Sequence, residues 1–300
     1  MLEILGKTNV DFMGKRLYAF ILSGALAALG LLAFTQIVRG QANLGIDFSG
    51  GTAVQLRFER PVEIGAARAA LAEGGLADAE LQEMTSEGAL LVRIKRQTAI
   101  EERAAERIGE LLRAKFPGNA LTVEGTTEIG PTVGRKLRDD AALATTIAMV
   151  GIMIYIALRF EFRFGVAAAI ATLHDVLAVL GVLYLLDKEI TLLIVTALLT
   201  LAGYSLTDTV VVFDRIRENL RRRRQEPIPQ AINASINQVL SRTVIVSLTT
   251  FLAVLAIYLW GGDVLKDFSL ALLMGVIVGT YSSIFVASPL LMLWRGAIRM

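Results

Sequence analysis

An ionisable carboxyl group lies inside a long apolar segment of the chain. Asp208 stands between Thr207 and Thr209 in the stretch TLAGYSLTDTVVVFDRIRENLRRRR, which begins apolar and ends in arginines. A charged carboxylate at bilayer depth costs about 2.5–3.5 kcal/mol on insertion scales, so membrane acids usually face a bundle interior or a water-filled path. Because Tyr204 and Ser205 share the face of Asp208 at helical spacing, we expect a polar stripe there, with Asp208 as a proton carrier.

Three further polar residues accompany Asp208 in neighbouring apolar segments. His174 and Asp175 lie near the middle of one, and Arg242 lies at the start of another within Ser-Arg-Thr. The His-Asp pair fits either a static interhelical hydrogen bond or a proton route. Arg242 fits either a side chain that snorkels to headgroups or a partner of Asp208. An arginine that approaches and withdraws would change the proton affinity of that carboxyl group.

Six segments are long and apolar enough to cross a bilayer, which takes about 20 residues each. They span residues 17–38, 141–158, 165–186, 190–213, 243–260 and 268–294. The chain of 300 residues is 54% hydrophobic and 19% charged, and it has no cysteine, which excludes disulfides and thiolate metal sites. The sequence therefore predicts an α-helical polytopic membrane protein, with the first segment retained as an anchor.

The distribution of Lys and Arg between short loops predicts the orientation. With the N-terminus in the cytoplasm, that side holds thirteen such residues: Lys7, Lys15, Arg16, Arg159, Arg163, Arg215, Arg217, Arg221, Arg222, Arg223, Arg224, Arg295 and Arg299. The short loops of the other side hold Lys188 and Lys266. We expect both termini inside, in a bacterial cytoplasmic (inner) membrane. The expected division is a cytoplasmic 1–16, a span 17–38, an outer domain 39–140, five spans in 141–294 and a cytoplasmic 295–300.

The outer domain shows alternating strand and helix patterns. Strands are expected at 52–59, 79–84, 89–95 and 121–129, and helices at 62–73 and 98–116, the second opened by Thr98 and Glu101 in a capping-box pattern. The order βαββαβ is the ferredoxin-like split arrangement. Such a fold hosts many functions, and it names none by itself.

Small residues mark two kinds of close approach. GIDFSGG and IGPTVGRKL bracket the outer domain, where glycines allow positive φ and tight backbone contact; ordinary loop turns are the alternative. Their candidate residues are Gly45, Asp47, Gly50, Gly51, Gly130 and Gly134. In the sixth span Gly275, Gly279 and Ser283 repeat every four residues, a helix-packing signature in membranes, and Ser288-Pro289 is expected to kink the end of that helix.

In order, GIDFSGG, GPTVGRKL, the His-Asp pair, GYSLTDTVVVFDRIREN, LSRTVIVSLTT and GVIVGTYSSIFVASPLL resemble the SecD/SecF family, and within it the SecF subunits of the bacterial protein-export (Sec) translocase. The resemblance spans nearly the whole chain. It implies half of a resistance-nodulation-division-like bundle, with a SecD-like subunit as the other half and the SecY/SecE/SecG channel as a further partner. It associates the acid of GYS-x-x-D (Asp208) and the arginine of S-R-T (Arg242) with proton conduction. The family usually has asparagine where this chain has Thr207, which leaves any role of the amide in doubt.

The implied function is to couple the proton motive force to late export of preproteins on the outer side. No cofactor is expected beyond the ion gradient, with H⁺ favoured over Na⁺. Anionic membrane lipids would bind the basic run Asp214–Arg224 (DRIRENLRRRR), and nucleic acid is not expected as a partner. The alternative is half of a small-molecule or lipid exporter of the same superfamily. An intramembrane aspartyl protease would need two carboxylates sharing a proton, and we do not expect an enzyme.

Overall fold

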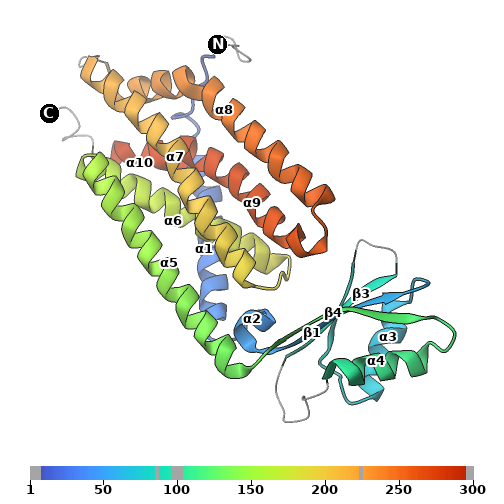
Figure 1. Cartoon of the computed structure of the whole chain (residues 1–300). Helices are drawn as coiled ribbons and strands as arrows, with labels where there is room; N and C mark the ends of the chain where they lie inside the picture. The colour runs from blue at the N-terminus through green and yellow to red at the C-terminus, as the bar shows by residue number, and fades with distance from the viewer. Residues whose placement is uncertain (1–7, 85–87, 96–103, 223–225, 295–300) are drawn as a thin grey trace. The chain divides into compact units, whose positions relative to one another are not determined.

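The computed structural model describes residues 8–84, 88–95, 104–222 and 226–294. The chain divides into two compact units, drawn in Figure 1. The helical unit comprises Met1–Asn43, Ala144–Lys188 and Leu193–Met300, and the α+β unit comprises Leu44–Leu143 and Glu189–Leu192. The second unit therefore includes a short segment that lies far along the chain from the rest of it.

Six helices within the described residues are long and apolar enough to cross a membrane, as the sequence predicted. They are α1 (Arg16–Val38), α5 (Pro131–Arg159), α6 (Phe162–Leu185), α7 (Leu192–Arg222), α8 (Ile228–Trp260) and a last helix that begins with α9 (Asp263–Ser282). The last helix continues through a π-helical turn η2 (Ser283–Ala287), then α10 (Ser288–Leu290) and η3 (Leu291–Trp294).

Three of these helices extend about nine or more residues beyond their predicted apolar segments. Helices α5 and α8 begin well before residues 141 and 243, and α7 continues past residue 213 to Arg222. Hydropathy marks only the apolar part of a helix, whereas polar residues of good helix propensity continue it into water. At the end of α7, for example, Glu218 pairs with Arg215 at 2.5 Å and with Arg222 at 3.0 Å along one helix face.

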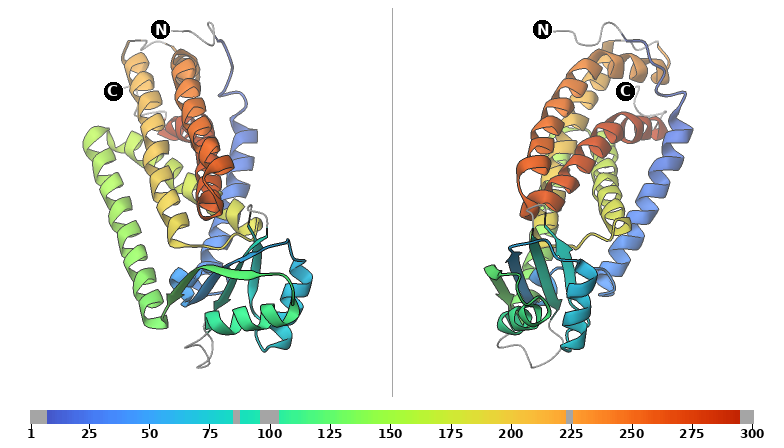
Figure 2. Two further views of the ribbon diagram at one scale, coloured as in Figure 1. Left: turned by 45° about the vertical axis from the view of Figure 1, so that its right-hand side comes forward. Right: turned by 90° about the vertical axis from the view of Figure 1, so that its right-hand side faces the viewer.

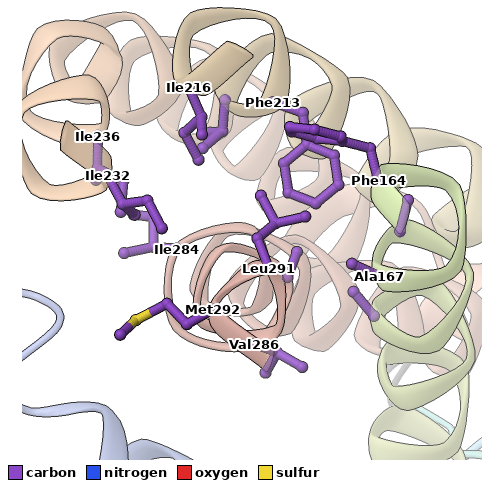
Figure 3. Packing of buried hydrophobic residues seen from close by; sticks show 14 of the residues in the cluster. Phe164, Ala167, Phe213, Ile216, Ile232, Ile236, Ile284, Val286, Leu291 and Met292 are labelled. Atoms are coloured by element: carbon purple, nitrogen blue, oxygen red, sulfur yellow. The ribbon is translucent and has the colours of Figure 1, made fainter. Parts of the chain in front are cut away.

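A cluster of buried apolar side chains joins α6, α7 and α8 to the end of the last helix (Figure 3). Phe213 is fully buried and lies edge-on to Phe164, with ring centroids 5.4 Å apart. Helices α1 and α6 approach closely at two glycines, because a Cβ atom added to Gly30 would lie 2.0 Å from the carbonyl oxygen of Leu177, and one added to Gly181 would lie 2.7 Å from the amide nitrogen of Gly30. Small residues permit such contacts where lipid provides no hydrophobic drive.

The α+β unit contains β1 (Gly51–Phe58), α3 (Ile64–Glu73), β2 (Glu80–Glu83), β3 (Ala89–Lys95), α4 (Ala104–Lys115) and β4 (Leu121–Ile129). Its strands are antiparallel in the order β2-β3-β1-β4, which confirms the predicted split βαββαβ arrangement. Both helices cover one face of the sheet (Figure 2), where Leu71 of α3 and Ile108 of α4 pack on Val54 and Val92.

Two details of this unit differ from the sequence expectation or lie beyond it. A short helix, α2 (Ile46–Ser49), precedes β1 and falls within the GIDFSGG motif, where the sequence predicted no helix. The predicted capping box of Thr98 and Glu101 lies outside the described residues.

Candidate functional site

The carboxyl group of Asp208 is held by hydroxyl groups from two other helices. Thr243 Oγ1 of α8 donates to Asp208 Oδ1 at 2.9 Å, and Ser283 Oγ, at the start of η2, donates to Asp208 Oδ2 at 2.5 Å. Thr243 and Ser283 are buried, and Asp208 is half-buried. The Asp208 side chain therefore points toward the interior of the bundle, as predicted, at the place where α7, α8 and the last helix meet.

Neither the predicted partner Arg242 nor the neighbouring Thr207 binds the carboxyl group of Asp208 among the interactions given for the described residues. The Arg242 side chain is exposed, and the hydrogen bonds and ion pairs recorded for the described part of the chain place Thr243, not Arg242, on that carboxyl group. Thr207 is also exposed, and its hydroxyl group donates to Gly203 O of its own helix at 3.0 Å. In this arrangement the charge of Arg242 acts on Asp208 through space, without a direct ion pair.

Asp175 is the centre of a second hydrogen-bonded cluster. Its Oδ1 lies 2.9 Å from His174 Nδ1, and its Oδ2 accepts from Ser205 Oγ of α7 and, at 2.7 Å, from Ser282 Oγ of α9. Asp175, Ser205 and Ser282 are fully buried. The His-Asp contact is thus within α6, and the bonds between helices are made by Asp175. His174 Nε2 is buried without a hydrogen-bond partner.

Consecutive residues of the last helix connect the two carboxyl groups. Ser282 donates to Asp175 and Ser283 donates to Asp208, at the point where the helix changes from α to π geometry. Single π-helical turns are uncommon and frequently occur at functional sites. This turn lies directly before Ser288-Pro289, where the sequence predicts a kink, and Ser288 Oγ donates to the carbonyl oxygen of Ser283 at 2.8 Å.

A third set of hydroxyl groups extends the arrangement. Tyr204 donates to Ser247 Oγ at 3.2 Å, and Ser247 Oγ lies 2.6 Å from Thr280 Oγ1. We call the whole set the polar layer; its members are His174, Asp175, Tyr204, Ser205, Asp208, Thr243, Ser247, Thr280, Ser282 and Ser283. It draws on α6, α7, α8 and the last helix, and buried hydroxyl and carboxyl groups of this kind can rearrange their bonds when a proton arrives.

The sequence did not single out Thr243, Ser247, Thr280 or Ser282, and it assigned Ser283 to packing alone. Two of them had a signal nearby: Thr243 completes the Ser-Arg-Thr phrase, and Ser282 adjoins the small-residue repeat. Those patterns place a residue near a site without indicating which partner it binds.

The glycines of that repeat lie where the last helix meets α7. A Cβ atom added to Gly275 would lie 2.6 Å from Leu201 Cδ1, and one added to Gly279 would lie 3.1 Å from Ser205 Cβ. The seam therefore keeps Ser205 within reach of Asp175.

We expect Gly279→Ala to lower the free energy of unfolding by about 1–3 kcal/mol, because the added methyl group forces the two helices apart. Thermal unfolding in detergent measures this. The matched control is Gly151→Ala in α5, where a Cβ atom meets nothing within 4 Å, so that the gain in helix propensity leaves stability equal or slightly higher. An equal loss of stability in both variants would contradict close packing of Gly279 against α7 as the cause of the effect.

The glycine motifs at the ends of the α+β unit contact each other. Gly50 and Gly51 have φ values of +73° and +139°. A Cβ atom on Gly134 would lie 2.9 Å from Gly50 N, and Gly134 N donates to Gly130 O at 2.9 Å. Positive φ and this close approach require glycine, so the two motifs form one junction instead of two independent turns. Gly45 and Asp47 contact a different segment, residues 189–192, described below.

No group of three or more His, Asp or Glu side chains in the described part of the chain could hold a metal ion.

Fold and site together define a polytopic helical membrane protein with a polar layer in its bundle and a ferredoxin-like α+β unit. A family model for "Protein export membrane protein SecD/SecF, C-terminal" matches residues 110–297, and one for the "SecD/SecF GG Motif" matches residues 42–62. The protein translocase subunit SecF of Thermodesulfovibrio yellowstonii is 50% identical over 98% of this chain and 97% of its own length. That of Calditerrivibrio nitroreducens is 42% identical over 98% and 96%.

Two solved structures of SecDF match at the level of fold. SecDF from Thermus thermophilus, described as a translocon-associated membrane protein, gives a TM-score of 0.83 at 40% identity and covers 96% of this chain. A second SecDF crystal form, described as super-membrane-facing, gives 0.70 at 39% identity over 97%. This chain spans 39% of the length of each of those chains.

The chain belongs to the SecD/SecF protein-export family and, within it, to the SecF subunits of the protein translocase. It is a multi-pass protein of the inner membrane, and the SecDF match indicates a SecD-type partner for it.

Proposed function

We propose that this subunit couples the proton motive force to late-stage export and release of preproteins on the outer side of the membrane. The observation that carries the proposal is the position of Asp208. Its carboxyl group lies within an apolar helix and accepts hydrogen bonds from hydroxyl groups of two other helices. As an acceptor from both Thr243 and Ser283 it suits the ionised form, which has no proton to donate. On protonation one carboxyl oxygen gains an O–H that needs an acceptor, which favours a rearrangement of the hydrogen bond at that oxygen.

That rearrangement gives a proton a mechanical effect. The bonds of Asp208 join α7 to α8 and to the last helix, so a change in them alters how these helices are held together. The last helix also bonds Asp175 through the adjacent residue, Ser282. We propose that Asp208 loads and unloads the proton while Asp175 and His174 form the second part of the route. H⁺ is favoured over Na⁺, and the proposal assigns no catalysis and no cofactor to the chain.

The proposed partners are a SecD-like subunit, the SecY/SecE/SecG channel, translocating preproteins and membrane lipids. Helix α5 is consistent with a neighbouring helix or lipid outside this chain. Only 6% of its most apolar 18-residue stretch is buried within the chain, against 61% for α6. The proposed orientation places both termini in the cytoplasm and the α+β unit outside. The names of the relatives favour this assignment over the exporter alternative.

Co-purification and reconstitution test the proposal. The subunit purified in mild detergent is expected to bring a SecD-like companion. The pair in proteoliposomes with the channel is expected to release a preprotein faster when a proton gradient is imposed. A periplasmic adaptor as companion, or release that ignores the gradient, would contradict the proposal.

Arg242 offers a graded test of the same function. Because Arg242 makes no direct ion pair with Asp208 in this structure, its influence is one of charge, which lysine retains. We expect Arg242→Leu to lower gradient-stimulated export about tenfold, a usual size for coupling between sites, and Arg242→Lys to lower it less. Equal loss in both variants would indicate that the geometry of the guanidinium group is required instead.

A further inference from the structure

A short connection between α6 and α7 is bound to the α+β unit. Residues Glu189–Leu192 cluster with Leu44–Leu143. Leu44 and Ile190 form an isolated parallel β-bridge, and Gly45 N donates to Ile190 O at 2.9 Å. A Cβ atom on Gly45 would lie 2.9 Å from Thr191 Cγ2, so the first glycine of the GIDFSGG motif is required for this contact.

The aspartate of the same motif binds the first residue of α7. Leu192 N donates to Asp47 Oδ2 at 2.9 Å, and Leu192 begins the helix. The first amide groups of a helix lack partners within it, and an anion near them is favourable. Asp47 therefore supplies the cap of α7 from a segment far away in the sequence.

A buried ion pair fixes the connection to the sheet. Arg93 Nη1 of β3 lies 2.9 Å from Glu189 Oε2, and their side chains are 23% and 7% exposed. Arg93 Nη1 also donates to Gln82 Oε1 of β2 at 3.1 Å. Burial raises the pKa of Glu189 because desolvation outweighs the attraction of Arg93; Lys95, Glu80 and Asp47 also act on it. A buried charge without its partner is costly. Removing or reversing the charge of either Arg93 or Glu189 alone would therefore weaken the attachment of Glu189–Leu192 to the sheet.

We infer that these contacts form a coupling joint, made of Leu44–Asp47, Arg93 and Glu189–Leu192, through which the α+β unit and helix α7 move together. The inference rests on the proposed function. Helix α7 is continuous from Leu192 to Arg222, and Asp208 lies sixteen residues beyond Leu192, about 24 Å at 1.5 Å per residue. One rigid element thus carries the carboxyl group and ends at the joint. Asp47, Arg93 and Glu189 are positioning residues that touch no proton in transit.

Charge reversal tests the joint in the reconstituted complex with the SecD-like subunit and channel. Arg93→Glu, Glu189→Arg and the double exchange are compared for two quantities, proton conductance and gradient-driven preprotein release. We expect each single variant to keep proton conductance and lose gradient stimulation about tenfold. The double exchange should recover most of the stimulation, because it restores an ion pair at the same place.

The matched control is Arg57→Glu, which breaks the more exposed Arg57–Glu124 pair of the same sheet. It should leave both quantities unchanged, since the pair lies outside the joint and exposed pairs contribute little. Single variants that release preprotein at the normal rate, or a double exchange that recovers nothing while melting at the normal temperature, would overturn the inference. Wild-type complexes that fail to respond to the gradient would instead contradict the proposed function.

Discussion

Asp208→Asn is expected to abolish the gradient-stimulated component of preprotein export while the subunit still assembles with its partner. Asparagine keeps the size of the side chain but cannot ionise. Its amide oxygen can still accept from Thr243 or Ser283, whereas its NH₂ group cannot accept from the other. One lost hydrogen bond costs about 1 kcal/mol, which is too little to unfold the bundle. Export from vesicles with and without a proton gradient measures the effect.

The control for this variant is Asp214→Asn, the same change six residues further along α7. Asp214 pairs with Arg159 at 2.7 Å, and both side chains are 42% exposed. An exposed pair contributes about 0–1 kcal/mol, so we expect normal export and assembly. If the proton gradient still stimulates export normally in Asp208→Asn, protonation of the Asp208 carboxyl group is not needed for export.

Asp175→Ala is expected to have the largest effect on stability. The change leaves Ser205 Oγ, Ser282 Oγ and His174 Nδ1 without their common acceptor in a fully buried position. Hydrogen bonds between membrane helices contribute about 0.6 kcal/mol each on average, and stranded buried groups cost more. We expect a loss of roughly 2–4 kcal/mol, measured by unfolding in mixed detergent micelles.

Asp175→Asn provides the comparison, because its amide oxygen can still accept from both Ser205 and Ser282, which share one oxygen of Asp175, and the side-chain volume is kept. It should be less destabilised than Asp175→Ala. If both variants unfold at the wild-type midpoint, Asp175 does not hold α6 to α7 and the last helix, and the second cluster of the polar layer loses its structural basis.

The sequence located the spans and the α+β order because both rest on local patterns. Apolar segments of bilayer length and alternating strand patterns are properties of neighbouring residues, and the six helices and the β2-β3-β1-β4 sheet follow from them. The same patterns underestimated α5, α7 and α8, whose polar ends remain helical in water. They also placed Asp208 on an inward face from its spacing to Tyr204 and Ser205.

The partners of Asp208 could not be predicted in the same way. Thr243 and Ser283 lie 35 and 75 residues away in the chain, and their contact depends on how three helices rotate about their axes. That rotation is set by packing, such as the fit of Gly279 against Ser205, which one sequence does not encode visibly. The joint at Glu189–Leu192 gave no signal, because Glu189 ends an ordinary short loop and the three residues after it read as the start of an apolar span.

Infrared difference spectroscopy of the purified subunit in lipid measures the protonation of Asp208 most directly. A protonated carboxyl group has a carbonyl stretch that is absent from the carboxylate. We predict a pH-dependent carbonyl signal of which one component is lost in Asp208→Asn and kept in Asp214→Asn; Asp175 and Glu189 are the buried carboxyl groups among the described residues that can also contribute to it. A spectrum without a pH-dependent carbonyl signal, or an Asp208→Asn spectrum identical to that of the wild type, would contradict the assignment of this residue as the proton carrier.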